Sequence, residues 1–223
     1  RNTRAGSRRN IHAHYDLGNA FYELWLDPSM NYSSAWFDGD TAQDTASAQQ
    51  AKMRRALRQV GLQPGMRLLE VGCGWGALAE CAAREFDARV TGVTLSTEQL
   101  DYARARLASR APDAPADLRL LDYRDIADAP FDAIASIEMF EAVGHAYWPS
   151  YFKLLHDKLA PGVVWRQESV IGSVFSATYA RPEVPLAGVP VEAVLPTIQG
   201  RAHVTLDATL VFDPADPFAW GLG

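Results

Sequence analysis

The sequence predicts an α/β fold whose core is an open, doubly wound parallel sheet. Strand-like and helix-like runs alternate up to Gly162, and the strand-like runs are continuously apolar, as in parallel sheets that helices cover on both faces. A glycine-rich turn joins the first of these strands to a helix. After Gly162 the alternation stops and proline becomes more frequent. We therefore expect a doubly wound domain followed by a β-rich tail.

Hydrophobic periodicity and turn residues place the elements in order. Strands are predicted at residues 66–71, 88–95, 118–121 and 131–137, and helices at residues 45–60, 77–86, 97–110 and 147–159. Pro161 and Gly162 end the last helix. In the tail, residues 202–206 and 209–212 are predicted to form a two-stranded hairpin. Sheets of this kind bind ligands at the carboxyl ends of their strands, so the site is expected there.

The stretch LLEVGCGWGALA, Leu68 to Ala79, gives the strongest chemical signal. Gly72, Gly74 and Gly76 permit positive φ angles and close approach of a ligand to the backbone. Glu70 precedes them, where an acid can hold a charged amine, which suits a methyl donor with an amino-acid tail. The spacing differs from the dinucleotide fingerprint, and the turn has no phosphate-binding lysine. The alternative is that the glycines only reverse the chain.

Composition excludes several classes of protein. The 223 residues carry a formal net charge of −6, which argues against a protein that coats nucleic acid. Two cysteines are too few for a disulfide framework and fit a reducing compartment. No apolar run is long enough to span a membrane, and no secretory signal or metal site is expected. The basic start, RNTRAGSRRN, is either a loose arm or a contact with an anionic membrane.

Five motifs resemble the family of cyclopropane-fatty-acyl-phospholipid synthases and mycolic acid methyltransferases. They are HYDLGNAFYELWLDPSMNYSSAWF (14–37), LLEVGCGWG (68–76), VTGVTLSTEQLDYARAR (90–106), LDYRDI (121–126) and IEMFEAVG (137–144). The resemblance covers about residues 12–162. It implies a Rossmann-like fold dependent on S-adenosylmethionine (SAM), with residues 1–64 as an N-terminal arm and helical lid and residues 65–162 as the SAM-binding core.

The resemblance also assigns the cofactor residues by position. Gly72 and Gly74 would line the methionine part of SAM. Thr94, Leu95 and Gln99 would lie at the ribose, and Tyr123 and Arg124 at the adenine. Tyr32 and Ser33 would close over the cofactor, although Tyr32 has the alternative of packing between N-terminal helices.

In this family the methyl acceptor is a cis double bond of an acyl chain, and a bound bicarbonate acts as the base. Glu141 matches the glutamate that holds bicarbonate, with a solvated carboxylate at a helix start as the alternative. Ser34 stands where several members have a cysteine that touches the same ion, and its hydroxyl can donate a hydrogen bond. His145 and Trp148 are interpreted as packing or surface residues.

The N-terminal motif is expected to order the lid rather than to do chemistry. Tyr15, Asp16 and Asn19 carry this expectation. The apolar side chains that follow are interpreted as packing between the helices and the sheet, with contact to an acyl chain as the alternative: Phe21, Tyr22, Leu24, Trp25 and Leu26.

Residues 163–223 resemble a different family, the C-terminal end of proline racemases and hydroxyproline 2-epimerases. WRQESVIGSVF (165–175) and GRAHVT with FDPADPFAWG (200–221) carry this resemblance. The parent reaction needs two cysteines, and both cysteines of this chain lie before the tail. We expect VVWRQESVIG, Val163 to Gly172, to replace the missing fifth strand of the sheet.

Three functions follow from these resemblances. The first is methylation or cyclopropanation of unsaturated acyl chains of phospholipids at the membrane surface. The second is N-methylation of a small amine, and the third is a catalytically impaired fusion that still binds SAM. A cytoplasmic protein is expected, either free or peripheral at the inner face of the membrane, and a homodimer is left open.

Overall fold

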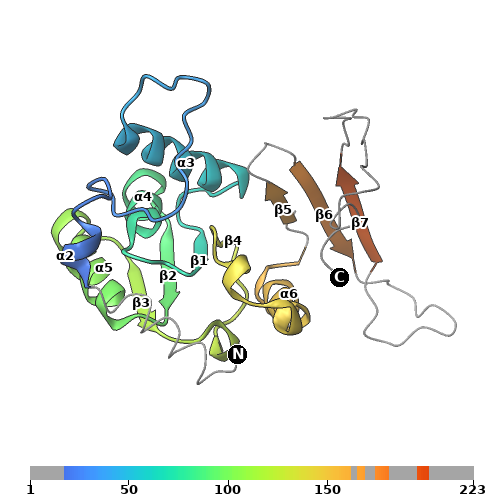
Figure 1. The fold of residues 1–223 in the computed structure, drawn as a ribbon. Helices are drawn as coiled ribbons and strands as arrows, with labels where there is room; N and C mark the ends of the chain where they lie inside the picture. Colours follow the sequence, from blue (N-terminus) through green and yellow to red (C-terminus); the bar gives the residue numbers. More distant parts are fainter. Residues whose placement is uncertain (1–17, 162–164, 169–173, 181–194, 201–223) are drawn as a thin grey trace, which may run out of the picture.

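The computed structural model describes residues 18–161, 165–168, 174–180 and 195–200. Its main sheet has four strands, β1 (Arg67–Val71), β2 (Arg89–Thr94), β3 (Ala116–Leu120) and β4 (Ala133–Ala135), in the order β3-β2-β1-β4. Every pairing between these strands is parallel. The strand order steps outward from β1 in both directions (Figure 1), which is the doubly wound arrangement. The predicted α/β class is therefore confirmed.

The described helices include two long ones whose first turns are capped by a side chain. They are α2 (Asn19–Tyr22), α3 (Thr45–Gln59), α4 (Ala77–Phe86), α5 (Thr97–Arg110) and α6 (Trp148–Lys158), with short 3-10 helices η1 (Tyr123–Asp125), η2 (Phe140–Ala142) and η3 (His145–Tyr147). The Asp44 side chain accepts from the Ser47 N–H at the start of α3, and Ser96 caps α5 through the Gln99 N–H. Within the described residues, no helix has the length and apolar character that crossing a membrane requires.

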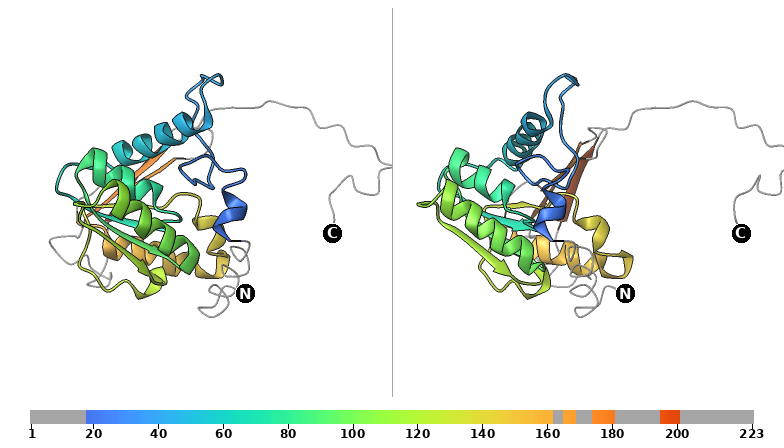
Figure 2. Two further views of the ribbon diagram at one scale, coloured as in Figure 1. Left: turned by 90° about the vertical axis from the view of Figure 1, so that its left-hand side faces the viewer. Right: turned by 60° about the vertical axis from the view of Figure 1, so that its left-hand side comes forward.

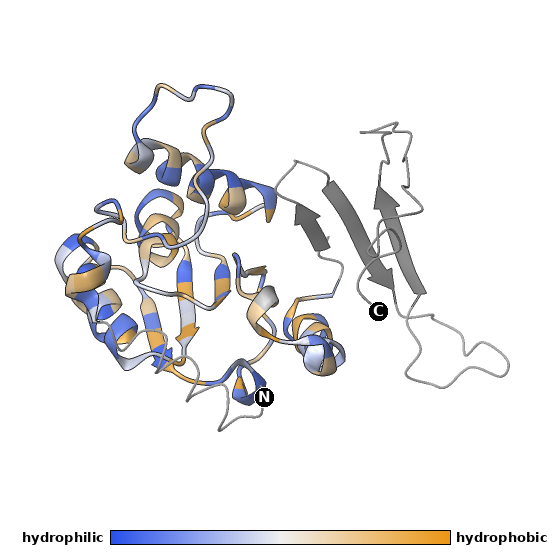
Figure 3. Ribbon diagram, viewed as in Figure 1, coloured by the Kyte–Doolittle hydropathy of each residue, from blue (hydrophilic) through white to orange (hydrophobic). Residues whose placement is uncertain are grey.

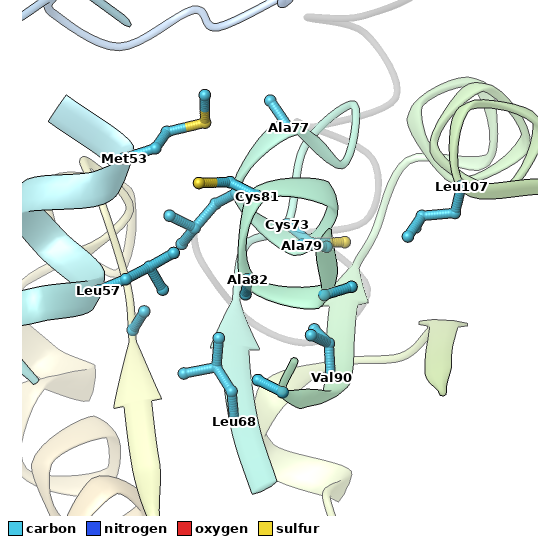
Figure 4. Close-up of a cluster of buried hydrophobic side chains, with 14 of the residues drawn as sticks. Met53, Leu57, Leu68, Cys73, Ala77, Ala79, Cys81, Ala82, Val90 and Leu107 are labelled. Atoms are coloured by element: carbon cyan, nitrogen blue, oxygen red, sulfur yellow. The ribbon is translucent and has the colours of Figure 1, made fainter. Parts of the chain in front are cut away.

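The two faces of the sheet carry separate cores because neighbouring residues of a strand point in opposite directions. Leu68 belongs to the core under α3, α4 and α5, together with Met53 and Leu57, which Figure 4 shows beside α4. Leu69 belongs to the opposite core, which Tyr151 of α6 closes. Helices therefore cover both faces (Figure 2), and α3 alternates hydrophilic and hydrophobic residues as a helix with one buried side does (Figure 3).

The N-terminal segment is fastened to the glycine turn at Trp75. The Asn19 side-chain oxygen accepts from the Trp75 indole N–H at 2.7 Å. Tyr22, Met30 and Trp75 are each 3% exposed and form a third, small core. This contact agrees with a role for Asn19 in ordering the lid. Tyr15 and Asp16 lie outside the described residues.

The expectation for the missing fifth strand is wrong for the described residues. β5 (Trp165–Glu168) pairs antiparallel with β6 (Val174–Ala180), which pairs with β7 (Leu195–Gly200) in a separate sheet. Beside β4, the described chain makes one isolated parallel bridge, Phe131 to Leu159. A hairpin partner close in sequence costs less loop-closure entropy than a distant edge of only three residues. The predicted strands at 202–206 and 209–212 lie outside the described residues.

The packing of α4 against α5 makes a specific prediction at Gly76. Its φ is +81°, and an added Cβ would lie 2.8 Å from the Ala103 Cβ and 3.1 Å from the Ala103 Cα. We expect Gly76→Ala to lower the free energy of unfolding by about 2–4 kcal/mol, since left-handed strain and overpacking add. Urea denaturation would measure this loss.

Gly61→Ala is the matched control for Gly76→Ala. Gly61 has φ +69° with open space around its added Cβ, so only the conformational cost of about 1–2 kcal/mol applies. Equal losses in the two variants would show that the contact with Ala103 does not restrict position 76.

Candidate active site

A cavity of about 600 Å³ opens at the carboxyl ends of the strands, within the roughly 300–1,000 Å³ typical of small-molecule sites. The turns after β1, β2, β3 and β4 and the N-terminal segment around Tyr32 line it. Nine of the ten residues that the sequence analysis assigned to the cofactor are in this lining: Tyr32, Ser33, Glu70, Gly72, Gly74, Thr94, Leu95, Gln99 and Tyr123.

The glycine turn lines the cavity with residues that have no side chain at Gly72 and Gly74. Gly72 and Gly74 have φ angles of 87° and 50°, which glycine adopts without steric cost. The N–H groups of Gly72 and Cys73 both donate to the Val93 carbonyl at 3.0 Å, which fixes the turn against β2. A Cβ at position 72 would lie 2.9 Å from the Met139 Cγ. Glycine at this position therefore leaves room beside Met139 in the cavity wall.

Glu70 is a buried carboxylate with an unsatisfied oxygen. It is 5% exposed, and its Oε2 has no hydrogen-bond partner. Burial raises the pKa of Glu70 to about 8, although a hydrogen bond with the Ala79 backbone opposes the rise. Buried carboxylates are normally paired, so one with an unsatisfied oxygen in the cavity wall fits a ligand that brings a positive charge.

The polar residues after β2 form a buried network. The Thr94 hydroxyl donates to the Gln99 side-chain oxygen at 3.0 Å and accepts from the Ser96 N–H at 3.2 Å. Thr94 and Gln99 are 6% and 5% exposed. The network holds the Gln99 amide at the N-terminal turn of α5, beside the cavity.

The structure places Tyr123 and Arg124, the two residues of η1 expected at the adenine, differently. Tyr123 lines the cavity, and burial raises the pKa of its hydroxyl. Arg124 is not in the cavity lining, because its guanidinium pairs with Asp122, the residue that caps η1, at 2.5 Å. An ion pair between residues two positions apart in the sequence keeps this side chain at η1.

The predicted catalytic serine is held by a glutamate that the sequence analysis missed. The Ser34 N–H and hydroxyl donate to the same Glu138 oxygen, at 2.9 and 2.5 Å. Glu138 lines the cavity, three residues beyond β4 and one residue beyond the predicted strand. A polar residue after a parallel strand is a signal that could have identified it.

For Glu141, the other predicted catalytic residue, the structure describes the backbone position. Glu141 lies in η2, and its side chain is outside what the structure describes. Trp148 stacks on Phe140 with ring centroids 4.9 Å apart, and His145 lies against Trp148 at 4.7 Å. These contacts agree with a packing role for His145 and Trp148.

The fold and cavity define a doubly wound α/β protein with a small-molecule site at the carboxyl ends of its strands. The model of the mycolic acid cyclopropane synthetase family matches residues 2–181, and the chain belongs to this family. The family resemblance predicted from the five motifs is thereby confirmed.

Individual relatives agree with this membership. A probable fatty acid methyltransferase of Pseudomonas putida is 47% identical over 68% of this chain and 39% of its own length. The cyclopropane-fatty-acyl-phospholipid synthase of Escherichia coli K12 is 44% identical over 66% of this chain and 37% of its own. The solved structure of mycolic acid cyclopropane synthase CmaA1, complexed with SAH and CTAB, superposes with a TM-score of 0.65 at 40% identity, covering 69% of this chain and 53% of that one.

The tail matches a second family. Residues 154–223 match the proline racemase family model, which confirms the resemblance predicted for the tail. The two family matches overlap, since the first ends at residue 181. The chain spans about 35–54% of the length of the curated relatives it matches. Coclaurine N-methyltransferase, solved with N-methylheliamine and SAH, shares the fold at a TM-score of 0.58 and 22% identity.

Proposed function

We propose that this chain binds SAM in the cavity and methylates the double bond of an unsaturated acyl chain, as a cyclopropane synthase does. The observation that carries the proposal is the unpartnered Glu70 oxygen beside the glycine turn, because SAM presents an ammonium group. When bound, SAM supplies a methyl group activated by the sulfonium. The remaining cofactor residues support the proposal because they line the same cavity.

Each residue of the cavity wall would bind the part of SAM that its position favours. Glu70 would bind the ammonium, and Gly72 and Gly74 would let the backbone approach the methionine part. Thr94, Leu95 and Gln99 would contact the ribose and Tyr123 the adenine, while Tyr32 and Ser33 would cover the cofactor; all of them line the cavity. A site that positions an activated methyl group needs no strong nucleophile.

The reaction also requires a group that removes a proton from the methylated acyl chain. Family membership favours bicarbonate held by Glu141 and Ser34 as that base. In this structure both donors of Ser34 serve Glu138. For Ser34 to bind bicarbonate, the Glu138 carboxylate must therefore turn away. If Glu138 stays in place, its carboxylate accepts the proton instead of bicarbonate.

An acyl substrate would enter from the exposed apolar surface near the lid. Phe21, Leu24 and Trp25 are 41%, 81% and 53% exposed, and Trp25 contacts the Tyr32 ring at 5.7 Å. This surface supports the part of the proposal that places phospholipid acyl chains, at the inner face of the membrane, beside the cavity. A homodimer stays a prediction.

Mass spectrometry of unsaturated phospholipid vesicles incubated with the chain and SAM tests the proposal. We expect the acyl chains to gain one methylene mass, and Glu141→Gln to lower the rate by about 100-fold or more. Glu98→Gln, at an exposed position of α5, is the control and should leave the rate unchanged.

Each alternative function has its own outcome in this experiment. Methylation of a small amine without lipid product would establish the N-methyltransferase alternative. Binding of SAM without any product would establish the impaired fusion. Absence of SAM binding would overturn the proposed function together with both alternatives.

A further inference from the structure

Ser33 and Ser34 are held from two sides by elements far away in the sequence. On one side, the Lys52 ammonium donates to the Ser33 hydroxyl at 2.6 Å, and the Gln49 amide donates to the Ser33 carbonyl at 2.8 Å. Both of these residues belong to α3. On the other side, the Glu138 carboxylate accepts both donors of Ser34. We call these four side chain and backbone contacts the serine clamp.

The backbone at Glu138 indicates that the clamp is specific. Glu138 has φ +46°, a left-handed conformation that a long side chain adopts at a cost in free energy. Such conformations persist where the surroundings determine them, and they concentrate at ligand sites. Here the conformation brings a carboxylate to Ser34, whereas glycine would adopt the same backbone without cost.

The charges of the clamp also favour a defined arrangement. Burial lowers the pKa of Lys52 to about 8, while the negative charges of Glu138 and Asp27 oppose the decrease. The Lys52 ammonium and the Glu138 carboxylate therefore attract each other across the two serines. Ser34 and Glu138 are exposed, so the clamp can open towards solvent without disrupting the core.

We propose that the serine clamp positions Tyr32 and Ser33 over the cavity, with Glu138 as its positioning residue, and so controls the affinity and release of the cofactor. The proposal rests on the proposed function in one respect, the identity of the ligand as SAM or its product S-adenosylhomocysteine (SAH). Tyr32, Ser33 and Glu138 all line the cavity, so opening the clamp uncovers the ligand.

The test compares SAH binding and amide exchange in Glu138→Gly, Glu138→Gln and the unmodified chain. Glu138→Gly removes the carboxylate and leaves the backbone unstrained, so its effects are not those of misfolding. We expect the Ser34 amide to exchange about tenfold faster, since its acceptor is gone. SAH should dissociate about tenfold faster, with a smaller change in the association rate. Glu138→Gln keeps an acceptor oxygen and should lie between.

The control is Glu85→Ala, which removes a different contact of α3. Glu85 pairs with Arg54 at 2.6 Å, and neither residue lines the cavity. SAH dissociation should be unchanged in this variant. If Glu138→Gly releases SAH no faster than the unmodified chain, the clamp has no role in the ligand site and the proposal is overturned, while the proposed function stands. If the unmodified chain binds no SAH, the proposed function and the ligand role of the clamp fall together.

Discussion

Replacing Arg106 with methionine is expected to lower the free energy of unfolding by about 3–5 kcal/mol. The Arg106 side chain is 3% exposed on α5. Its guanidinium donates to the carbonyls of Ser29 at 2.6 Å, Pro28 at 2.7 Å and Trp75 at 3.2 Å. It also lies 3.5 Å from the Glu80 carboxylate. Methionine fills a similar space but leaves these buried acceptors without their donor, and each such loss costs free energy.

The loss at Arg106 would reach the candidate site through the chain. Pro28 and Ser29 lead directly to Met30, which is 3% exposed and begins the cavity lining. We therefore expect Arg106→Met to weaken SAH binding as well, by loosening the segment that carries Tyr32. Urea denaturation gives the stability, and calorimetry at a temperature where the variant is folded gives the affinity.

Arg104→Met is the matched control on the same helix. Arg104 makes one hydrogen bond, to the Leu118 carbonyl at 2.7 Å, from an exposed position. Its replacement should cost about 1 kcal/mol. A similar cost in the two variants would show that Arg106 contributes no more than an ordinary surface arginine.

The local signals in the sequence identified most of the elements but not their partners. Continuous apolar runs at 66–71 and 88–95 gave β1 and β2, because a strand buried on both faces needs apolar residues throughout. β3 begins at Ala116, before its predicted start, since Ala116 and Asp117 pair with Val90 and Thr91. Hydrogen bonding to the neighbouring strand β2 sets where β3 begins. A polar residue such as Asp117 can therefore extend the strand without an apolar signal in the sequence.

In the candidate site, too, the local turn could be predicted from the sequence, whereas the contacts between distant residues could not. Glu70 and the glycines share one short motif, and their turn could be predicted from that motif alone. The contact between Ser34 and Glu138 joins residues 104 positions apart, and the contact between Lys52 and Ser33 joins residues 19 positions apart. A single sequence carries no record of which distant side chains meet. Arg124 shows the opposite case, because the Asp122 carboxylate with which it pairs is only two positions away in the sequence.

Binding of SAH near neutral pH is expected to release almost one proton from Glu70. Burial raises the pKa of this carboxyl to about 8 from the ordinary value of 4.5, so the free protein holds a proton there at about pH 7. The ammonium of the ligand would favour the charged carboxylate and expel the proton. Between about pH 6 and pH 7.5, the dissociation constant should therefore fall about tenfold per pH unit.

As the pH rises, the affinity for SAH should increase, whereas the contribution of Glu70 to the free energy of unfolding should decrease. A raised pKa means that the folded chain binds a proton which the unfolded chain has already lost, from about pH 4.5 to pH 8. The contribution of Glu70 to the free energy of unfolding is full below this window and is lost as the pH rises through it. Bound SAH should restore stability in the upper part of the window.

Calorimetry in buffers of different ionisation enthalpy measures the released proton directly. For the unmodified chain at about pH 7, the observed enthalpy should change with the buffer in proportion to nearly one proton. Glu70→Gln should remove this dependence and weaken binding by about 100-fold, because the ammonium loses a buried charged partner. Asp101→Asn, at an exposed position of α5, should change neither quantity. Tight binding without proton release would mean that the ammonium does not meet Glu70, and the assignment of the cavity to SAM would lose its main support.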